Sequence, residues 1–564
     1  MEVFLGIDLG TTTTLIGRAI EGEKAISVKV LPIKQKDGRG NEKELTYLPS
    51  VAYLPPAGEL LVGLEAQNRG PEEDASRYIR AVKRQMGRRL LLPVVNLEPY
   101  KVSAAYLAHA LKEGRYQLPL ADPVFTVTVP ASFTTNQRAD TLLALREACA
   151  EINLRYPEEN EGELFISEPV AAMLAFLNQE FEKPAAVRRL DLSKPSRVVV
   201  YDIGGGTLDL TIVYVEPRTT PVRGLEDIDI HVDAIGYYNP FGGEDLDLEL
   251  AKALYQRLLE QFPELHDLQL TPEQRLGVRL QLMNVAKSIK EELSEQMGEK
   301  DDDLRFLDEG EEEAVYFSKE IRILNQLYAL EGEITETEYR EIIHDLLNNS
   351  SRKSLTTSLQ DLLKKTKFSP DRLDGLLVVG GAARLPLIQE RLRNFWGNER
   401  IWVFQPPDHA IVTGAAIYSY LRRRSPGFVL EEPAADAYYV RLKEKFDLIL
   451  PANAKDKKGE KKRYELDSEA SRLLLQIFAG EEAEAGEPIE SIYPSLIHQG
   501  GTTINLGQTY PAGTPVWVQM RYAGEPGTDD HSKVPWIYVW VGKEQGEPLF
   551  HRRYSDFVQE AQNG

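Results

Sequence analysis

Apolar runs that end in glycine recur along the chain and predict its strands. The run Val198–Tyr201 is continuously apolar, three glycines follow at 204–206, and a second apolar run extends from Leu208 to Val215. This pattern predicts an antiparallel hairpin with a glycine tip. Because glycine has no Cβ, the backbone N–H groups of such a tip can approach a phosphate chain closely. A plain hairpin turn is the alternative for one such motif on its own.

A second stretch near the start of the chain has the same design. An apolar run from Val3 leads to Asp8, Gly10 and four threonines, and Asp202 takes the place of Asp8 in the later stretch. The repetition predicts two similar half-domains that present their hairpin tips to a shared cleft, with two unrelated hairpins as the alternative. Asp8, Asp202 and Asp209 flank the tips, where carboxylates can hold Mg²⁺ through its waters.

Two strand–turn–helix units are predicted between the hairpins. Pro123–Pro130 reads as a strand followed by a helix that ends near Glu151, and Leu164–Ile166 reads as a strand followed by Glu168 and a helix to Asn178. Ligands of open α/β sheets gather at the carboxyl ends of strands. Glu168 is therefore a candidate for holding the metal or the attacking water, and a helix-capping role is the alternative.

The segment Arg77–Leu90 is conspicuously basic in an acidic chain. One interpretation is a solvated helical face. The other is that Lys83 reaches the cleft and stabilises charge that develops on a transferring phosphoryl group.

Glycine pairs also precede two predicted helices in the second half. The turn Gly242–Asp245 opens a helix with one apolar face, formed by Leu246, Leu250, Leu254 and Leu258. Capping residues at Thr271 and Thr335 predict two further helix starts. The strand Leu376–Val379 runs into Gly380 and Gly381, where a ribose or a flat ring could approach the backbone; a close helix–strand contact is the alternative.

Beyond a change of composition at residues 422–427, the pattern predicts short strands. They are Ala437–Leu442, Phe446–Leu450, Leu473–Phe478, Val516–Tyr522 and Trp536–Val541. We expect a linker at 425–435 and an all-β sandwich at 436–564. Trp536, Tyr538 and Trp540 alternate with aliphatic residues, so both faces of that strand need cover, either from the core or from a bound partner.

Composition narrows the function classes. The 564 residues carry a formal net charge of −22, which argues against nucleic acid as a main partner. The single cysteine, Cys149, fits a reducing compartment, and no pair of histidines has metal-ligand spacing. Without a basic leader or an apolar run of membrane-spanning length, we expect a cytoplasmic protein without membrane contact.

Together these motifs resemble the seventy-kilodalton heat-shock chaperone family of the actin-like ATPase superfamily. The resemblance is carried by Gly6–Thr12, Val127–Ala131 with Gln137–Arg138, Glu168–Ala172, Asp202–Asp209, Gly242–Asp245, and Val379–Gly381 with Arg384–Pro386. It implies an α/β fold, with a two-lobed actin-like ATPase domain (a duplicated ribonuclease-H-like fold) at residues 1–424, followed by the β-sandwich.

The resemblance also implies ATP or ADP with Mg²⁺ between the lobes, and K⁺ as a further candidate cation. The implied metal-holding residues are Asp8, Asp202 and Asp209, and the implied catalytic residues are Lys83, Glu168, Asp202 and Thr207. The implied nucleotide-binding residues are Gly10, Thr11, Thr12, Gly204, Gly205, Gly206, Gly242, Gly243, Glu244, Lys290, Ser294, Gly380, Gly381, Arg384 and Asp408. Pro130 and Arg138 match the positions that relay nucleotide state to the β-domain.

The chain departs from the family pattern in three places. The adenosine-contacting helix matches the family at two of four positions, which here are Lys287, Lys290, Glu291 and Ser294. After the double glycine, Ala382 and Ala383 replace two small hydroxyl residues. The interdomain linker is reduced to Phe428–Glu432. The stretch after Gly542 is too short for the family's helical lid.

We therefore expect an ATP-hydrolysing chaperone whose nucleotide state controls binding of unfolded polypeptide or a dedicated protein partner, with co-chaperones as further partners. The alternative from another class is a nucleotide-gated scaffold or regulator with little hydrolysis. A small-molecule kinase on the same fold ranks third.

Overall fold

The structure is a computed structural model of the whole chain. It describes residues 2–553 except 23–24, 88–90, 116–122, 134, 157–163, 220, 237–238, 300–311, 349–354, 426–427, 429–436, 443–444, 451–458, 481–496 and 522–535. Most of the predicted linker at 425–435 lies outside these residues.

The first lobe is built on a mixed sheet of order β11-β10-β1-β2-β3, with β6 paired to β2. Strands β1, β10 and β11 run parallel, whereas β2 and β3 run antiparallel to their neighbours. The bounds are β1 (Val3–Leu9), β2 (Thr13–Ile20), β3 (Ser27–Val30), β6 (Leu48–Pro49), β10 (Pro123–Val129) and β11 (Phe165–Ser167). The sheet is buried against α2 and α3.

Smaller elements complete this lobe. They are β4 (Ile33–Lys36), β5 (Glu42–Leu45), β7 (Val51–Tyr53), β8 (Leu61–Val62), β9 (Tyr78–Arg80), α1 (Gly63–Glu73), α2 (Pro99–Arg115) and α3 (Thr135–Glu151).

The second lobe repeats the sheet of the first. Its order is β14-β13-β12-β17-β18. From β14 onward its pairs are antiparallel, antiparallel, parallel and parallel, as they are in the first sheet from β3 to β11. The bounds are β12 (Ser196–Ile203), β13 (Leu208–Pro217), β14 (Ile228–Ile235), β17 (Gly375–Val379) and β18 (Ile401–Val403). The predicted duplication is therefore confirmed, and the two glycine hairpins, β1–β2 and β12–β13, hold equivalent places in the two sheets.

Helices and one further hairpin cover the outer side of the second sheet and form its largest apolar core. They are α5 (Gly243–Gln261), α6 (Pro272–Glu299), β15 (Ala314–Ile323), β16 (Gln326–Thr335), α7 (Glu336–Ile342), α8 (His344–Asn348), α9 (Thr357–Thr366) and α10 (Pro386–Trp396). The four predicted leucines of α5 are all fully buried. The predicted Thr271 capping box is present, because Thr271 and Gln274 exchange hydrogen bonds of 2.9 and 3.2 Å.

Two helices pack between the sheets: α4 (Glu168–Glu182) and α11 (Ala410–Arg424). They cross at small residues, and a Cβ on Gly414 of α11 would overlap the backbone of Ala171 in α4. A Cβ on Gly6 of β1 would likewise lie 2.6 Å from the carbonyl oxygen of Val412 in α11. The lobes are thus joined by backbone-to-backbone contacts that leave no room for a larger side chain.

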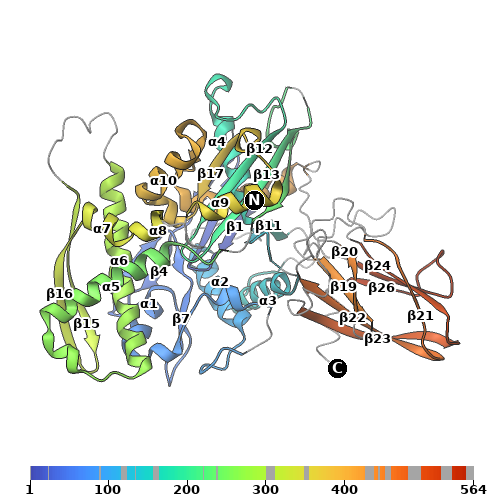
Figure 1. Cartoon of the computed structure of the whole chain (residues 1–564), viewed down its shortest axis with the longest axis horizontal. Coiled ribbons are helices and arrows are strands. Elements are labelled where there is room, and N and C mark those ends of the chain that lie inside the picture. The colour runs from blue at the N-terminus through green and yellow to red at the C-terminus, as the bar shows by residue number, and fades with distance from the viewer. Residues whose placement is uncertain are drawn as a thin grey trace.

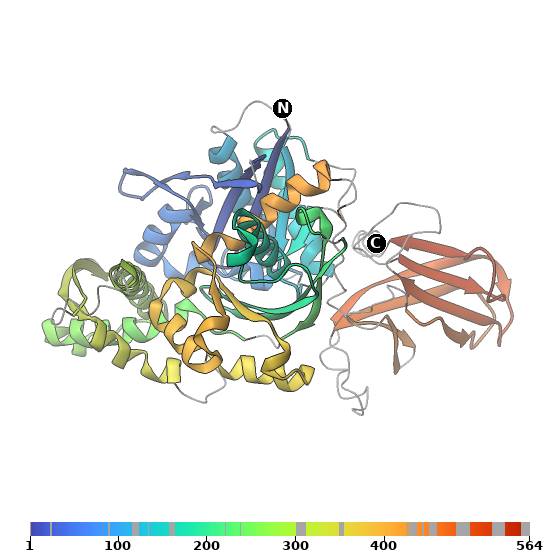
Figure 2. The same cartoon turned by 90° about the horizontal axis from the view of Figure 1, so that it is seen from above.

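The C-terminal strands form two four-stranded sheets of order β20-β19-β22-β23 and β21-β24-β25-β26. Their bounds are β19 (Ala437–Leu442), β20 (Lys445–Leu450), β21 (Lys462–Glu465), β22 (Ala470–Gly480), β23 (Ile497–Tyr510), β24 (Pro515–Arg521), β25 (Trp536–Val541) and β26 (Phe550–Arg553). Side chains from both sheets share one core, so the unit is a β-sandwich. Figures 1 and 2 show it beside the two lobes.

Both faces of β25 are covered. Ile537 and Val539 lie in the sandwich core, while Tyr538 and Trp540 form a second cluster with Trp517 and are at most 8% exposed. Lys461 and Arg521 lie over the Trp540 and Tyr538 rings at 3.7 and 3.9 Å from the ring centroids. These burials favour packing over an open partner surface.

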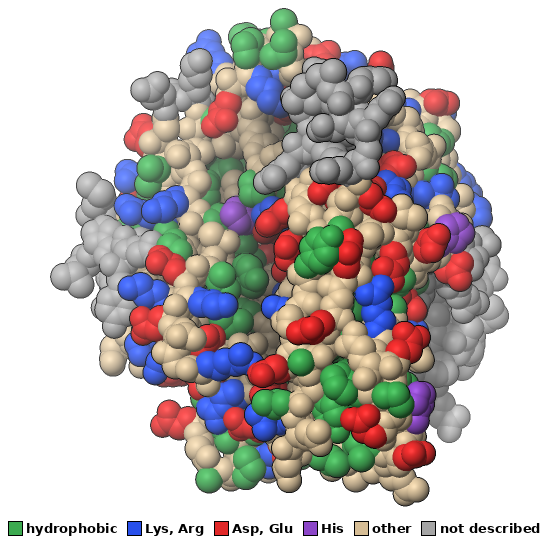
Figure 3. All heavy atoms as spheres, turned by 90° about the vertical axis from the view of Figure 1, so that its left-hand side faces the viewer, with side chains coloured by type: hydrophobic (Ala, Val, Ile, Leu, Met, Phe, Trp, Pro, Cys, Tyr) green, Lys and Arg blue, Asp and Glu red, His purple; other side chains and the backbone are tan. Residues whose placement is uncertain are grey.

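The fold agrees with the predicted class, an actin-like α/β domain and a β-sandwich. The helix predicted to start after Thr335 breaks between α7 and α8. Strands β16, β21, β23 and β26 lacked the alternation that would have predicted them. On the face shown in Figure 3, acidic and basic side chains are interspersed, which is typical of a solvated surface.

The crossing of α4 and α11 can be tested with a matched pair of helical glycines. Gly414→Ala should lower the free energy of unfolding by roughly 1–3 kcal/mol, because the methyl group has no space at Ala171. Gly298→Ala in α6, where a Cβ meets nothing within 4 Å, should leave it unchanged or raise it by up to about 1 kcal/mol. Urea unfolding measures both, and equal effects would contradict the assigned contact.

Candidate functional site

A cleft of about 2520 Å³ lies between the lobes. The two glycine tips meet in it, since a Cβ on Gly205 would lie 2.5 Å from the Thr12 side chain. All the predicted site residues line this cleft except Gly242 and Arg138. The structure therefore brings together residues that are far apart in the sequence, as the repeated motif predicted.

The two tips have the same backbone turn. Gly10 N–H donates to the Thr13 carbonyl, and Gly204 N–H donates to the Thr207 carbonyl, both at 2.9 Å. Glycines in each tip let an anion approach the backbone N–H groups, and the first tip adds threonine hydroxyls.

The second tip also anchors the start of α5. Gly243 N–H and Glu244 N–H donate to the Gly204 and Gly205 carbonyls at 3.0 and 2.5 Å. Gly242 lies behind the tip, where a Cβ would come within 2.7 Å of the Gly204 and Gly205 backbone. Its role is thus to allow close packing of the helix start, which explains why it does not line the cleft.

Four carboxylates gather beside the tips. Asp202 and Asp209 face each other across the β12–β13 ladder, Asp8 ends the equivalent strand β1, and Glu168 begins α4. Burial raises the pKa of Asp8 and of Asp209 to about 6, and repulsion from Glu168 adds to both shifts. Burial, followed by repulsion from the other carboxylates, raises the pKa of Asp202 well above its ordinary value. The charges of this cluster are thus poorly compensated by the protein itself.

Lys83 is the basic residue buried among these carboxylates. It is 5% exposed, and its Nζ lies 2.5 Å from Glu168 Oε1 and 5.5 Å from the centre of the Phe133 ring. It sits in the short 3₁₀ helix η2 (Val82–Gln85), which follows Ala81 in a left-handed conformation. Of the two interpretations of the basic segment, the structure supports the one that brings Lys83 into the cleft. Glu168 begins the helix and also pairs with Lys83, so its position agrees with both interpretations of that residue.

Two further arginines of the basic segment, neither of them predicted, reach the cleft. Arg84 donates to the Gly206 carbonyl. Arg80 forms an ion pair of 2.7 Å with Glu244, which connects the first lobe to the start of α5 in the second. The density of basic residues in an acidic chain was the available signal, but it could not distinguish among them.

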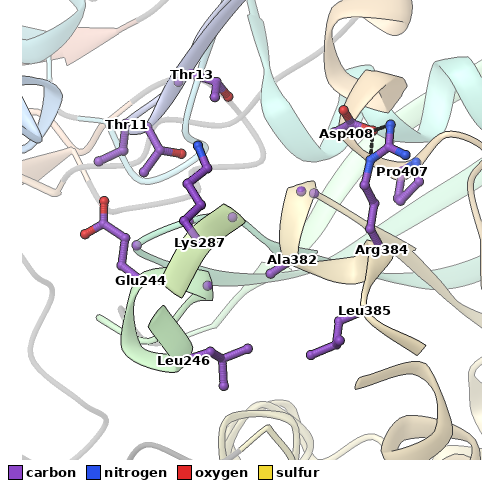
Figure 4. Close-up of a pocket in the computed structure, with 18 of the residues that line it drawn as sticks. Thr11, Thr13, Glu244, Leu246, Lys287, Ala382, Arg384, Leu385, Pro407 and Asp408 are labelled. Atoms are coloured by element: carbon purple, nitrogen blue, oxygen red, sulfur yellow. Dashed lines mark hydrogen bonds and ion pairs between the residues drawn. The ribbon is translucent and has the colours of Figure 1, made fainter. Parts of the chain in front are cut away.

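The predicted base-binding end of the cleft lies between α6 and the Gly380–Arg384 turn. Gly380 has φ 92°, and a Cβ there would lie 2.5 Å from the Ile203 carbonyl oxygen, so the close approach requires glycine. Arg384 Nε donates to Asp408 Oδ1 at 2.9 Å, and Figure 4 shows this pair across the cleft from Thr11, Glu244 and Lys287.

Lys290 and Ser294 also line this end. Lys290 Nζ lies 2.6 Å from Asp247 Oδ1 and donates to the Gly243 carbonyl at 3.2 Å. The Ser294 hydroxyl donates to the Lys290 carbonyl at 2.6 Å. Asp247, which was not predicted, thus fixes Lys290 against the start of α5.

The two predicted relay residues lie beside the phosphate end. Pro130 follows β10 and lines the cleft. Arg138 is on α3, and its Nε donates to the Phe133 carbonyl at 3.4 Å. Phe133 in turn packs against Lys83. The geometry connects both residues to the site through one loop, while their relay role remains a prediction.

The carboxylate cluster fits a divalent cation held through water. Within the described ranges, no three His, Cys, Asp or Glu side chains are grouped closely enough to ligate a metal directly. Mg²⁺ usually keeps several waters and binds through one or two carboxylates and substrate phosphates. Buried, mutually repelling carboxylates at the phosphate-binding tips are the donor set that such an ion requires.

The cost of burying Asp8 is testable without any ligand. Between about pH 4 and pH 6 the folded protein keeps a proton on Asp8 that the unfolded chain has lost. The stability that this proton contributes is fully present below the unfolded pKa and is lost as pH rises through about 6. Asp8→Asn keeps an acceptor for the 2.9 Å bond from Thr128 Oγ1. We expect it to stabilise the metal-free protein by the order of 1–3 kcal/mol at pH 7.

The same substitution should have almost no effect near pH 3, below the ordinary pKa of 3.8, where the unfolded chain also holds most of the proton. Urea unfolding at pH 3 and pH 7 checks this, with the exposed Asp371→Asn as the matched control. A gain in stability that is the same at both pH values would contradict the assigned burial cost.

Comparisons with known proteins agree with the geometry. The family model described as Hsp70 protein matches residues 93–430. The chain is 28% identical over 499 residues to the chaperone protein DnaK of Thermotoga neapolitana, which covers 86% of this chain and 72% of the relative, and the figures for Thermotoga maritima are the same. For DnaK of Thermosipho melanesiensis the identity is 28% over 422 residues, covering 74% and 59%.

None of the helices in the described part of the chain has the length and apolar character of a membrane span. Since the family model spans more than half of the sequence, and the duplicated sheets form an actin-like ATPase fold, this protein belongs to the Hsp70 family.

Proposed function

We propose that the protein binds and hydrolyses ATP with Mg²⁺, and that its nucleotide state controls binding of unfolded polypeptide. The observation that carries this function is the meeting of the two glycine tips over the buried Asp8, Glu168 and Asp202 and the half-buried Asp209, with Lys83 paired to Glu168. The family is one of ATPases and chaperones, and the DnaK relatives are named as chaperones.

The tips suit a polyphosphate. The backbone of Gly10–Thr12 from one lobe and of Gly204–Thr207 from the other would bind phosphate oxygens from two sides. Asp8, Asp202 and Asp209 would hold the magnesium ion, which supplies neutralisation of the phosphate charge. Both tips are needed, so nucleotide binding also holds the lobes together.

The chain's own residues then position the reaction. Lys83, fixed by Glu168, offers a positive charge at the point where charge develops on the γ-phosphoryl group. The Glu168 carboxylate and the Thr207 hydroxyl would orient a water for in-line attack. Positioning and charge neutralisation carry most of the acceleration of phosphoryl transfer.

The β-sandwich is the proposed polypeptide-binding unit, and the loop that holds Pro130 and Phe133 would couple it to the nucleotide. The boundaries at 424 and 436, the co-chaperones and the cytoplasmic location remain predictions.

Substitution of Lys83 should strongly slow turnover without preventing binding. Lys83→Met and Thr207→Ala are expected to lower kcat by roughly 10²–10³-fold, because each removes a group that acts on the transferring phosphoryl group. Steady-state release of phosphate measures turnover, and calorimetry with Mg·ADP measures binding. Lys252→Met on the exposed face of α5 is the matched control. Unchanged turnover in Lys83→Met would refute the assigned roles.

Polypeptide binding by the full chain should depend on the nucleotide. We expect an unfolded model polypeptide, followed by fluorescence anisotropy, to dissociate at different rates in the presence of ATP and ADP. Pro130→Ala should reduce that difference while leaving ATP binding intact. If no unfolded polypeptide binds and one folded protein co-purifies in equal amount, the scaffold alternative holds instead.

A further inference from the structure

Three lysines line the cleft within the described part of the chain, and Lys287 is the least paired of them. The Nζ atoms of Lys83 and Lys290 lie 2.5 and 2.6 Å from carboxylate oxygens. The nearest described carboxylate oxygen to Lys287 Nζ belongs to Glu291 and lies 3.7 Å away, beyond hydrogen-bond distance. Lys287 and Glu291 are also the two positions of the adenosine-contacting helix that depart from the family pattern.

The Lys287 side chain reaches across the cleft to the first glycine tip. Its Nζ lies 5.6 Å from the centre of the Tyr47 ring. Tyr47 directly precedes β6, which pairs with β2 at Thr13 and Thr14, immediately after the tip. Figure 4 shows the side chain extending toward Thr11 and Thr13. The ammonium group therefore lies beside the first tip although it belongs to α6 of the second lobe.

Tyr47 also connects this position to the base-binding end. Burial raises the pKa of Tyr47, Lys287 lowers it, and Glu291 and Asp408 raise it further, so these three charges act on one side chain. Asp408 is the partner of Arg384 at the base-binding end. Lys287 thus lies between the first tip and the base-binding end.

The ammonium group of Lys287 keeps its charge in this position. Burial lowers its pKa, but Glu291, Tyr47 and two further carboxylates outweigh that effect, so the pKa lies above its ordinary value. The side chain is only 27% exposed. A largely buried charge without a hydrogen-bonded partner costs folding free energy. A ligand that brings an anionic group to this point would offset that cost.

We propose that Lys287 binds the α-phosphate of the nucleotide, as a substrate-binding residue in addition to the two glycine tips. This assignment rests on the proposed function. A nucleotide with its terminal phosphates beside the carboxylate cluster and its base near Arg384 has its ribose and α-phosphate between them, where Lys287 lies. The α-phosphate is the only anionic group in that part of the ligand, and an ammonium group binds it more strongly than the neutral ribose hydroxyls.

Binding measurements without turnover test the assignment. Calorimetry of the full-length protein with Mg·ADP, and with the magnesium complex of a non-hydrolysable ATP analogue, gives two dissociation constants. Lys287→Met should weaken both ligands by the same factor, roughly 10–100-fold, because both carry the α-phosphate and each loses a charge-assisted hydrogen bond. Lys287→Gln repeats the test with a polar side chain, and Lys287→Arg, which keeps the charge, should retain most of the affinity. Lys252→Met, on the exposed face of α5, should leave both constants unchanged.

Glu291→Gln separates a ligand contact from a structural ion pair. If Lys287 serves the nucleotide, Glu291→Gln removes only a competing carboxylate and leaves the affinity for ADP unchanged or higher. If Lys287 serves only its pair with Glu291, both substitutions lower the urea midpoint alike and neither changes the affinity for ADP, which would overturn the assignment.

The two ligands also locate the contact along the nucleotide. A larger loss for the ATP analogue than for ADP would place Lys287 at the terminal phosphate and refute its assignment to the α-phosphate. If the wild type binds neither ligand, the proposed function has itself failed. If the wild type binds both and Lys287→Met binds them equally well, only the role of the lysine is wrong.

Discussion

The structure depends on a local excess of negative charge that the protein does not neutralise by itself. Four carboxylates converge where the two hairpins meet, against one buried lysine that is already paired with Glu168. Such a cluster costs folding free energy unless a cation or protons occupy it. The hydrophobic cores on either side, and the close crossing of α4 and α11, offset that cost. The carboxylates of the site therefore repel one another within a closely packed frame.

The same frame would carry the effect of a ligand, under the proposed function, away from the site. Each lobe contributes one glycine tip, so a polyphosphate with its metal ion would bridge the two sheets. The sheets are joined elsewhere by α4 and α11, whose backbones touch at Gly414 and Ala171. Because these contacts cannot be compressed, a change at the tips would favour a rotation of the lobes over local repacking.

Much of this site was predictable because its chemistry is local in sequence. The glycine tips, the aspartates beside them and the duplication all follow from two short stretches, and Gly380 from a third. Lys83 could be proposed but not distinguished from a solvated residue, since only the fold shows that η2 turns it toward Glu168. The partners Asp247 and Arg80 were missed because they act across elements that are far apart in sequence, where no periodicity connects them. Strand β16 was missed because apolar residues lie on both of its faces: Leu327 and Ala329 are exposed beside the buried Tyr328 and Leu330, so polar and apolar residues do not alternate there.

At the base-binding end, the alanines that depart from the family pattern are packed in the interior. Ala382 and Ala383 are buried, so hydroxyl groups there have been replaced by apolar packing. Lys290 nevertheless remains fixed by Asp247 and by the Gly243 carbonyl. Under the proposed function, fewer polar groups at the ribose and base would leave the phosphate end as the main source of binding energy. Such a site would discriminate by the number of phosphates more than by the base, because the glycine tips and the proposed metal-holding carboxylates would act only on the polyphosphate.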